Sequence, residues 1–156
     1  MTRKLQIAVV GDNNPSPEVM QWAEEVGQLL AQHEAVVVCG GLGGVMAAVA
    51  RGAVTHGGTT VGILPTYDAA TGNSSLSIVI PTGVGHARNV MVVAAGDAVI
   101  ALPGSYGTLS EVALALKLGK PVIGVNAWAD VKGVQTAKTP SEAVTLALAA
   151  AHQLNS

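Results

Sequence analysis

The sequence predicts an α/β fold in which helices cover both faces of a parallel sheet, a Rossmann-like architecture. Short apolar runs rich in valine and isoleucine alternate with longer segments of helical periodicity, as in βαβ units. The apolar runs lack the polar alternation of half-exposed strands, so we expect strands buried on both faces. A chain of 156 residues suffices for one domain with a single core, and we expect residues 1–156 to form one domain.

Each element follows from its own segment. Strands are expected over residues 5–10, 35–39, 60–64, 77–80, 98–102 and 121–125. Helices are expected over residues 17–32, 44–56, 86–95, 109–118 and 139–148. Ser16 is the predicted N-cap of the first helix, ahead of Pro17, and Thr139 with Glu142 forms a T-x-x-E capping box for the last. The segments 66–75 and 127–138 are predicted to be surface loops.

Composition excludes several classes of protein. Hydrophobic residues make up 49% and charged residues 12%, which excludes disorder and predicts an apolar surface typical of an oligomer. A net charge of −2 with 8 Lys and Arg predicts no binding to nucleic acid or to an anionic membrane. Without an apolar run of about 18 residues or a signal-peptide pattern, we expect a cytoplasmic protein. Cys39, at the end of a predicted buried strand, is expected to be an inert core thiol.

Three turns that contain glycine each join a predicted strand to a predicted helix. They cover residues 11–14, 40–44 and 103–108. Free N–H groups at helix starts bind anions, and the carboxyl ends of parallel strands meet at one edge, so an anion-binding rim is expected there. The dinucleotide fingerprint fails at Met46, and Gly119-Lys120 lacks the P-loop context. Alternatively, the glycines serve only to allow positive φ and close helix–sheet contact.

Two isolated charges accompany the third turn. Arg88 is the only formal charge in its apolar predicted helix, and Glu111 is the only carboxylate at the start of the next one. A guanidinium buried alone would cost several kcal/mol, so Arg88 must be paired or must face a ligand. The alternative for Arg88 is an ion pair with an acid of a second subunit, and for Glu111 a capping box with Thr108. His86 could line the same crevice or only cap its helix.

No metal is implied by the sequence. The histidines at positions 33, 56, 86 and 152 lack the spacing of metal ligands, and no cysteine or acid cluster completes a site.

At these residues the sequence resembles the LOG (LONELY GUY) family, often mislabelled as lysine decarboxylases, and in particular its short relatives close to the molybdenum cofactor carrier proteins. The family motif P-G-G-x-G-T-x-x-E corresponds to residues 103–111, H-x-R-K to residues 86–89, and a G-G-x-x-G-x-M-like turn to residues 40–46. The resemblance extends over residues 7–125. Asn89 replaces the family lysine and Ser105 the second motif glycine, and the chain is shorter than typical LOG enzymes. These departures point to the short branch of the family, in which binding without hydrolysis is an alternative to catalysis.

The resemblance implies a single Rossmann-like nucleotide-binding domain that forms a homodimer or homotetramer and binds a small phosphorylated ligand without a cofactor. The function that the resemblance predicts first is the activity of LOG enzymes, hydrolysis of the N-glycosidic bond of a nucleoside 5′-monophosphate. The alternative is a carrier that binds the molybdenum cofactor or another pterin phosphate without hydrolysis. A lysine decarboxylase is not supported, because no lysine has the context of a Schiff base with pyridoxal phosphate.

The resemblance also implies roles for individual residues. Arg88 and Glu111 are the catalytic pair, in which Glu111 would stabilise the oxocarbenium character of the ribose and Arg88 would anchor the phosphate or the leaving base. The phosphate-binding turn consists of Gly104, Ser105, Tyr106, Gly107 and Thr108. The other candidates for ligand binding along the rim are Gly11, Gly40, Gly41, Gly43, Gly44, Met46 and His86.

Overall fold

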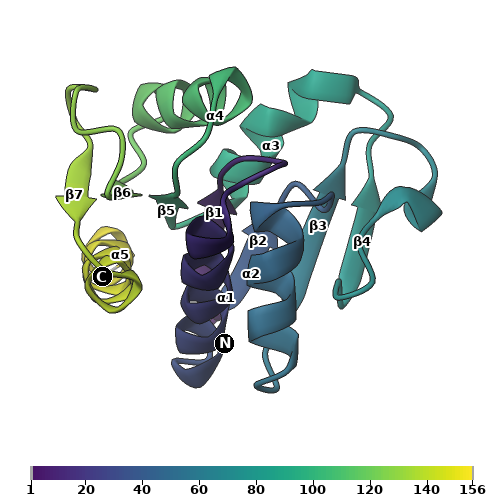
Figure 1. Ribbon diagram of the computed structural model, residues 1–156, viewed down its shortest axis with the longest axis horizontal. Helices are drawn as coiled ribbons and strands as arrows, with labels where there is room; N and C mark the ends of the chain where they lie inside the picture. Colours follow the sequence, from purple (N-terminus) through teal and green to yellow (C-terminus); the bar gives the residue numbers. More distant parts are fainter. Residues whose placement is uncertain (1, 156) are drawn as a thin grey trace.

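The strands form one parallel sheet of seven strands in the order β4-β3-β2-β1-β5-β6-β7 (Figure 1). This computed structural model describes residues 2–155. The strands are β1 (Gln6–Val10), β2 (Val36–Cys39), β3 (Thr60–Leu64), β4 (Ile78–Pro81), β5 (Ala98–Ala101), β6 (Val122–Val125) and β7 (Gln135–Ala137). The predicted Rossmann-like α/β fold is confirmed. Strand order reverses between β1 and β5, and the crevice beyond the carboxyl ends of such strands is the usual ligand site of the fold.

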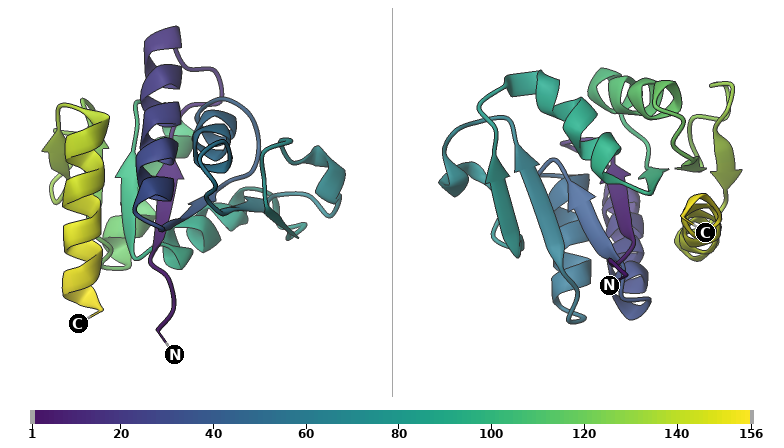
Figure 2. Two further views of the ribbon diagram at one scale, coloured as in Figure 1. Left: turned by 90° about the horizontal axis from the view of Figure 1, so that it is seen from below. Right: turned by 180° about the vertical axis from the view of Figure 1, so that it is seen from behind.

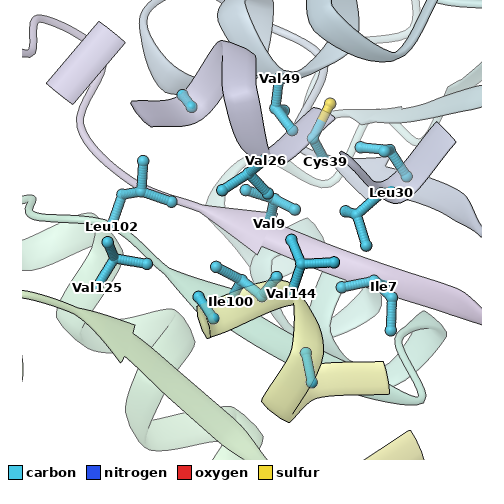
Figure 3. Packing of buried hydrophobic residues seen from close by; sticks show 14 of the residues in the cluster. Ile7, Val9, Val26, Leu30, Cys39, Val49, Ile100, Leu102, Val125 and Val144 are labelled. Carbon is cyan, nitrogen blue, oxygen red and sulfur yellow. The ribbon is translucent and has the colours of Figure 1, made fainter. Parts of the chain in front are cut away.

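Helices cover both faces of the sheet (Figure 2). They are α1 (Pro17–Gln32), α2 (Val45–Val54), α3 (Arg88–Ala95), α4 (Tyr106–Lys117) and α5 (Pro140–Leu154), with short 3₁₀ helices η1 (Ala69–Thr71) and η2 (Gly85–Ala87). On one face α1, α2 and α5 pack against the sheet through residues such as Leu30 and Val144 (Figure 3). On the other face α3 and α4 pack through Val92 and Val112.

The predicted helix starts at Ser16 and Thr139 are present. The Oγ of Ser16 accepts the N–H of Val19 at 3.3 Å, and Pro17 begins α1. The Oγ1 of Thr139 accepts the N–H of Glu142 at 3.1 Å, which starts α5. Capping of this kind satisfies N–H groups that have no partner within the helix. The last helix continues to Leu154, six residues beyond the predicted end.

Two predictions from local pattern are wrong. The predicted loop 127–138 contains β7, a short edge strand whose first two residues are exposed. The fourth helix begins at Tyr106 instead of Leu109, so that Thr108 lies inside its first turn. Thr108 is therefore not an N-cap, and the capping-box interpretation of Glu111 fails because its carboxyl has no helix start to close.

Cys39 lies in the core, and burial raises the pKa of its thiol to about 11. A thiol with such a pKa is almost wholly protonated at neutral pH and is a poor nucleophile, in agreement with the prediction. No helix within residues 2–155 is long and apolar enough to cross a bilayer.

Candidate functional site

A pocket of about 450 Å³ opens at the carboxyl edge of the sheet, next to the β1–β5 switch point. Its volume lies within the range of small-molecule sites. It is lined by Gly11, Asp12, Asn13, Leu42, Pro65, Gly85, His86, Arg88, Asn89, Ser105, Gly107, Thr108 and Glu111. These residues come from the turns after β1 and β2, the connections after β3 and β4, and the first turns of α3 and α4.

Backbone hydrogen bonds join the three turns of the rim. The N–H of Asp12 donates to the carbonyl of Pro103 at 3.3 Å, and the carbonyl of Asp12 accepts the N–H of Val45 at 3.0 Å. Gly44 precedes Val45 with φ +62°, and a Cβ there would lie 2.3 Å from the carbonyl oxygen of Asp12. Only glycine tolerates both the conformation and the close approach. The turns therefore form one connected rim.

Arg88 lies at the floor of the pocket with 7% of its surface exposed. Its Nε donates to the carbonyl of Ile63 at 3.0 Å, its Nη2 to the carbonyl of Gly40 at 3.3 Å, and its Nη1 to Oδ1 of Asn89. All three acceptors are neutral, and among residues 2–155 the guanidinium forms no ion pair. Burial lowers the pKa of Arg88, and the Glu111 carboxyl partly offsets this effect. The guanidinium is thus a fixed cation that interacts electrostatically with Glu111 but forms no ion pair with it within the described chain.

The close packing around this guanidinium explains two of the predicted residues. A Cβ at Gly40 would lie 2.8 Å from Nη2 of Arg88 and 2.7 Å from Sδ of Met46. Met46 is itself buried in α2. Gly40 therefore packs closely against both Met46 and the Arg88 guanidinium, and neither Gly40 nor Met46 lines the cavity.

Glu111 is the second buried ionisable group of the pocket, with 9% of its surface exposed. Burial raises the pKa of its carboxyl to about 7, although the Arg88 charge acts in the opposite direction. Within the described chain no group donates a hydrogen bond to this carboxyl. A carboxyl that is half ionised near neutral pH can accept or release a proton there. Such perturbed groups in clefts are typical of functional sites.

The first turn of α4 presents backbone N–H groups to the same pocket. Ser105 is the N-cap, but its side chain makes no capping hydrogen bond, so the N–H groups of the first turn remain available for an anion. A Cβ at Gly107 would meet no atom within 4 Å, which leaves open space beside this turn. Ser105 has a negative φ of −113°, so the position does not need the left-handed conformation that favours glycine, and it accommodates the serine in place of the motif glycine.

The structure brings seven of the fourteen predicted site residues to one pocket. Arg88, Glu111, Ser105, Gly107, Thr108, Gly11 and His86 line it. Gly104 and Tyr106 instead line a separate cavity of about 220 Å³ next to Trp128. Gly104 also packs on Thr108, since a Cβ there would lie 2.1 Å from its Oγ1. Gly41, Gly43 and Gly44 do not line the pocket and serve the turn that carries it.

Six residues that line the pocket are not among the individually predicted site residues. They are Asp12, Asn13, Leu42, Pro65, Gly85 and Asn89. Asp12, Asn13 and Leu42 lie in the predicted rim turns 11–14 and 40–44, and polar residues shortly after a parallel strand are a usable signal for a ligand site. Pro65 and Gly85 had no such signal, because their place depends on the long connections around β4. Asn89 was considered only as the loss of a cation.

The fold and the pocket define a Rossmann-like protein with one buried cation, one buried carboxyl and a helix N-terminus at the switch point of a parallel sheet. The chain belongs to the SLOG cluster4 family, whose sequence profile matches residues 4–154. The resemblance inferred from the motifs is thereby confirmed.

Individual relatives fall into two groups. A structure of the molybdenum cofactor binding protein from Rippkaea orientalis superposes with a TM-score of 0.91 at 37% identity, over 96% of this chain and 98% of that one. The Moco carrier protein from Chlamydomonas reinhardtii has a TM-score of 0.87 at 31% identity, over 97% and 99%. A cytokinin riboside 5′-monophosphate phosphoribohydrolase from Mycobacterium tuberculosis is 32% identical, over 76% of this chain and 68% of its own. An uncharacterized protein from Archaeoglobus fulgidus is 44% identical, over 90% and 92%.

Proposed function

We propose that the chain binds a phosphorylated pterin of the molybdenum cofactor type in this pocket and carries it without hydrolysis. The observation that carries the proposal is the Arg88 guanidinium, which is buried on neutral acceptors and directed to the pocket that the α4 N-terminus also faces. A phosphate ester would supply a negative charge. Its oxygens would accept hydrogen bonds from the free N–H groups of the Arg88 guanidinium and of the α4 N-terminus. The cofactor would be the transported ligand, and its phosphate is the group that Arg88 and the α4 N-terminus would bind.

Similarity to the cofactor-binding relatives and side-chain chemistry favour a carrier over a hydrolase. The cofactor-binding relatives match this chain almost end to end, whereas the chain spans 48% of the phosphoribohydrolase from Rhodococcoides fascians. Asn89 supplies no second cation beside Arg88. With one guanidinium, the site holds less positive charge to bind the phosphate and to stabilise the negative charge that develops on the leaving base.

Hydrolysis of a nucleoside 5′-monophosphate is the second candidate, and it is supported by Glu111. The carboxyl faces the same pocket as Arg88 and has a pKa of about 7. Ionised, it could stabilise an oxocarbenium-like ribose while water attacks the anomeric carbon and the base departs. In that case ribose 5-phosphate and the free base would be the products.

One experiment separates the two candidates. The purified protein is equilibrated anaerobically with molybdenum cofactor released from a molybdoenzyme, and separately with AMP, and each mixture is assayed for retained ligand and for free adenine. A carrier retains the pterin through gel filtration and releases no adenine. Adenine release that is lost in Glu111→Gln supports the hydrolase instead. If neither ligand is retained nor cleaved, both candidates are wrong.

We also propose that the protein is a homodimer or homotetramer assembled through α3 and α4. Met91 on α3 and Tyr106 and Leu109 on α4 stay exposed on helices that pack against each other. Sedimentation velocity at micromolar concentration should give a multiple of the 15.6 kDa chain mass, and Leu109→Lys should shift it toward the monomer. A monomer alone in the unmodified protein would contradict the proposal.

A further inference from the structure

A chain of hydrogen bonds links the Arg88 guanidinium to the first turn of α4. Nη1 of Arg88 donates to Oδ1 of Asn89, and Nδ2 of Asn89 donates to Oγ of Ser110 at 3.2 Å. The Ser110 hydroxyl in turn donates to the carbonyl of Gly107 at 2.6 Å. Asn89 is buried with 7% of its surface exposed, so water does not readily replace these partners.

The chemistry of its two ends gives this chain a single direction. A guanidinium can only donate and a carbonyl can only accept, so the amide of Asn89 must accept from Arg88 and donate to Ser110. The hydroxyl of Ser110 then has its one hydrogen committed to Gly107. A lysine at position 89 would have three donors and no acceptor, and it could not accept the hydrogen bond from Arg88. The asparagine thus supplies an acceptor that the family lysine lacks.

The chain of hydrogen bonds ends on a helix turn that lines the pocket. In an α-helix the carbonyl of residue 107 is also the acceptor for the N–H of residue 111. The same turn carries Thr108 and precedes Glu111, both of which line the pocket. A shift of Ser110 therefore moves both of its partners: Asn89, which contacts Arg88, and the Gly107 carbonyl, which accepts the N–H of Glu111.

We propose that Asn89, anchored by Ser110, is a positioning residue that holds the Arg88 guanidinium at a fixed distance from the N-terminus of α4. The two groups then bind one anionic group of the ligand together, which requires their separation to be constant. The proposal rests on the proposed function only in taking that anionic group to be a phosphate ester. Ser110 does not line the pocket, so its effect on binding must pass through Asn89 or through the Gly107 carbonyl, and only the first route alters the Arg88 guanidinium.

The matched pair of variants is Ser110→Ala and Ser110→Thr. Alanine removes the hydroxyl without harm to the helix, and threonine keeps it. The first readout needs no ligand: exchange of the Arg88 Nε–H with water, followed by ¹⁵N NMR and assigned by its absence in Arg88→Lys. Arg3 and Arg51 have side chains that are 57% and 44% exposed and provide fast-exchanging references. Ser110→Ala should speed the exchange about 3- to 10-fold, the effect of one hydrogen bond, and Ser110→Thr should stay within about 2-fold.

The second readout is affinity for whichever probe the unmodified protein retains, molybdenum cofactor or AMP. Ser110→Ala should weaken it about 3- to 10-fold and Ser110→Thr should restore it. Unchanged Nε–H exchange in Ser110→Ala overturns the positioning role, whether or not a ligand binds. Faster exchange in a protein that retains neither probe supports the positioning role and rejects the proposed function. Faster exchange with unchanged affinity overturns the claim that the two groups bind one anion together.

Discussion

Replacing Glu111 with glutamine should make the protein more stable above neutral pH and leave its stability nearly unchanged near pH 4.5. Burial raises the pKa of this carboxyl from 4.5 to about 7 in the folded chain. The folded state therefore binds a proton that the unfolded state has released between these two pH values, and stability falls as the pH rises through that window. Above pH 7 the full penalty, on the order of 3 kcal/mol, is present, and glutamine removes it.

Thermal unfolding at pH 4.5 and pH 8, at one protein concentration, measures this difference. For a chain of this size the variant should melt roughly 5–10 °C higher at pH 8 and within about 2 °C of the unmodified protein at pH 4.5. Glu25→Gln, on the exposed side of α1, is the matched control. It should change the free energy of unfolding by no more than about 0.5 kcal/mol at either pH. Equal melting of Glu111→Gln and the unmodified protein at pH 8 would show that the carboxyl is not held in a buried environment.

A stability cost of this kind is informative because packing alone would not retain it. Glutamine has nearly the shape of glutamate, and it would fit position 111 without a charge to bury. The chain keeps a group that weakens the fold at neutral pH, in the pocket where a buried cation also lies. Proteins commonly retain such destabilising groups in a cleft because the groups are needed for function.

Most of the fold could be predicted because most elements leave a local signal. Buried strands such as β1 and β5 are continuous apolar runs, and Ser16 and Thr139 mark the starts of α1 and α5. β7 leaves no such signal, since it has three residues, lies at the sheet edge and contains Gln135 and Thr136. β7 forms because it pairs with β6 in parallel, and its own residues do not predict a strand.

The α4 boundary was missed for a different reason. Glycine at position 107 is a poor helix former, and the T-x-x-E pattern that begins at Thr108 places the start three residues too late. The helix starts earlier because tertiary packing holds the turn, with Gly104 fitted closely against Thr108. This shift matters for the site, since it buries Glu111 and leaves the N–H groups of Tyr106 and Gly107 without a capping side chain.

The site could be predicted in part because motif residues that carry isolated charges attract attention. Arg88 and Glu111 stand out against apolar helices. Asp12 and Pro65 reach the pocket only because β1 and β3 end at the same edge of the sheet, and strand order is not written in any local pattern. The role of Asn89 depends on Ser110, which lies 21 positions away in the chain.

Replacing Arg88 with methionine should weaken binding of the retained ligand by about 30-fold to 1,000-fold. Methionine fills a similar volume without the charge, so the loss reports the guanidinium and not an empty space. Truncating one partner of a buried, hydrogen-bonded charge pair costs about 2–4 kcal/mol in binding, which corresponds to this range. Isothermal titration calorimetry with the probe that the unmodified protein retains gives the ratio of dissociation constants, and thermal unfolding confirms that the variant is folded.

The matched control is Arg51→Met. Arg51 contacts Glu24 at 3.3 Å on the surface, with both side chains more than two-fifths exposed, and such pairs contribute little. Its loss should leave the dissociation constant unchanged. If Arg51→Met weakens binding as much as Arg88→Met, the effect comes from overall charge and Arg88 has no special place in the site.

Arg88→Lys then separates charge from geometry. Lysine keeps the positive charge but has a flexible ammonium in place of the planar fork that donates to Ile63, Gly40 and Asn89. If the fork is needed to hold the cation opposite the α4 N-terminus, lysine should recover less than half of the binding free energy that methionine loses. Recovery close to the unmodified affinity would show that a positive charge alone suffices. In that case the three neutral acceptors around Arg88 would serve only to satisfy a buried group.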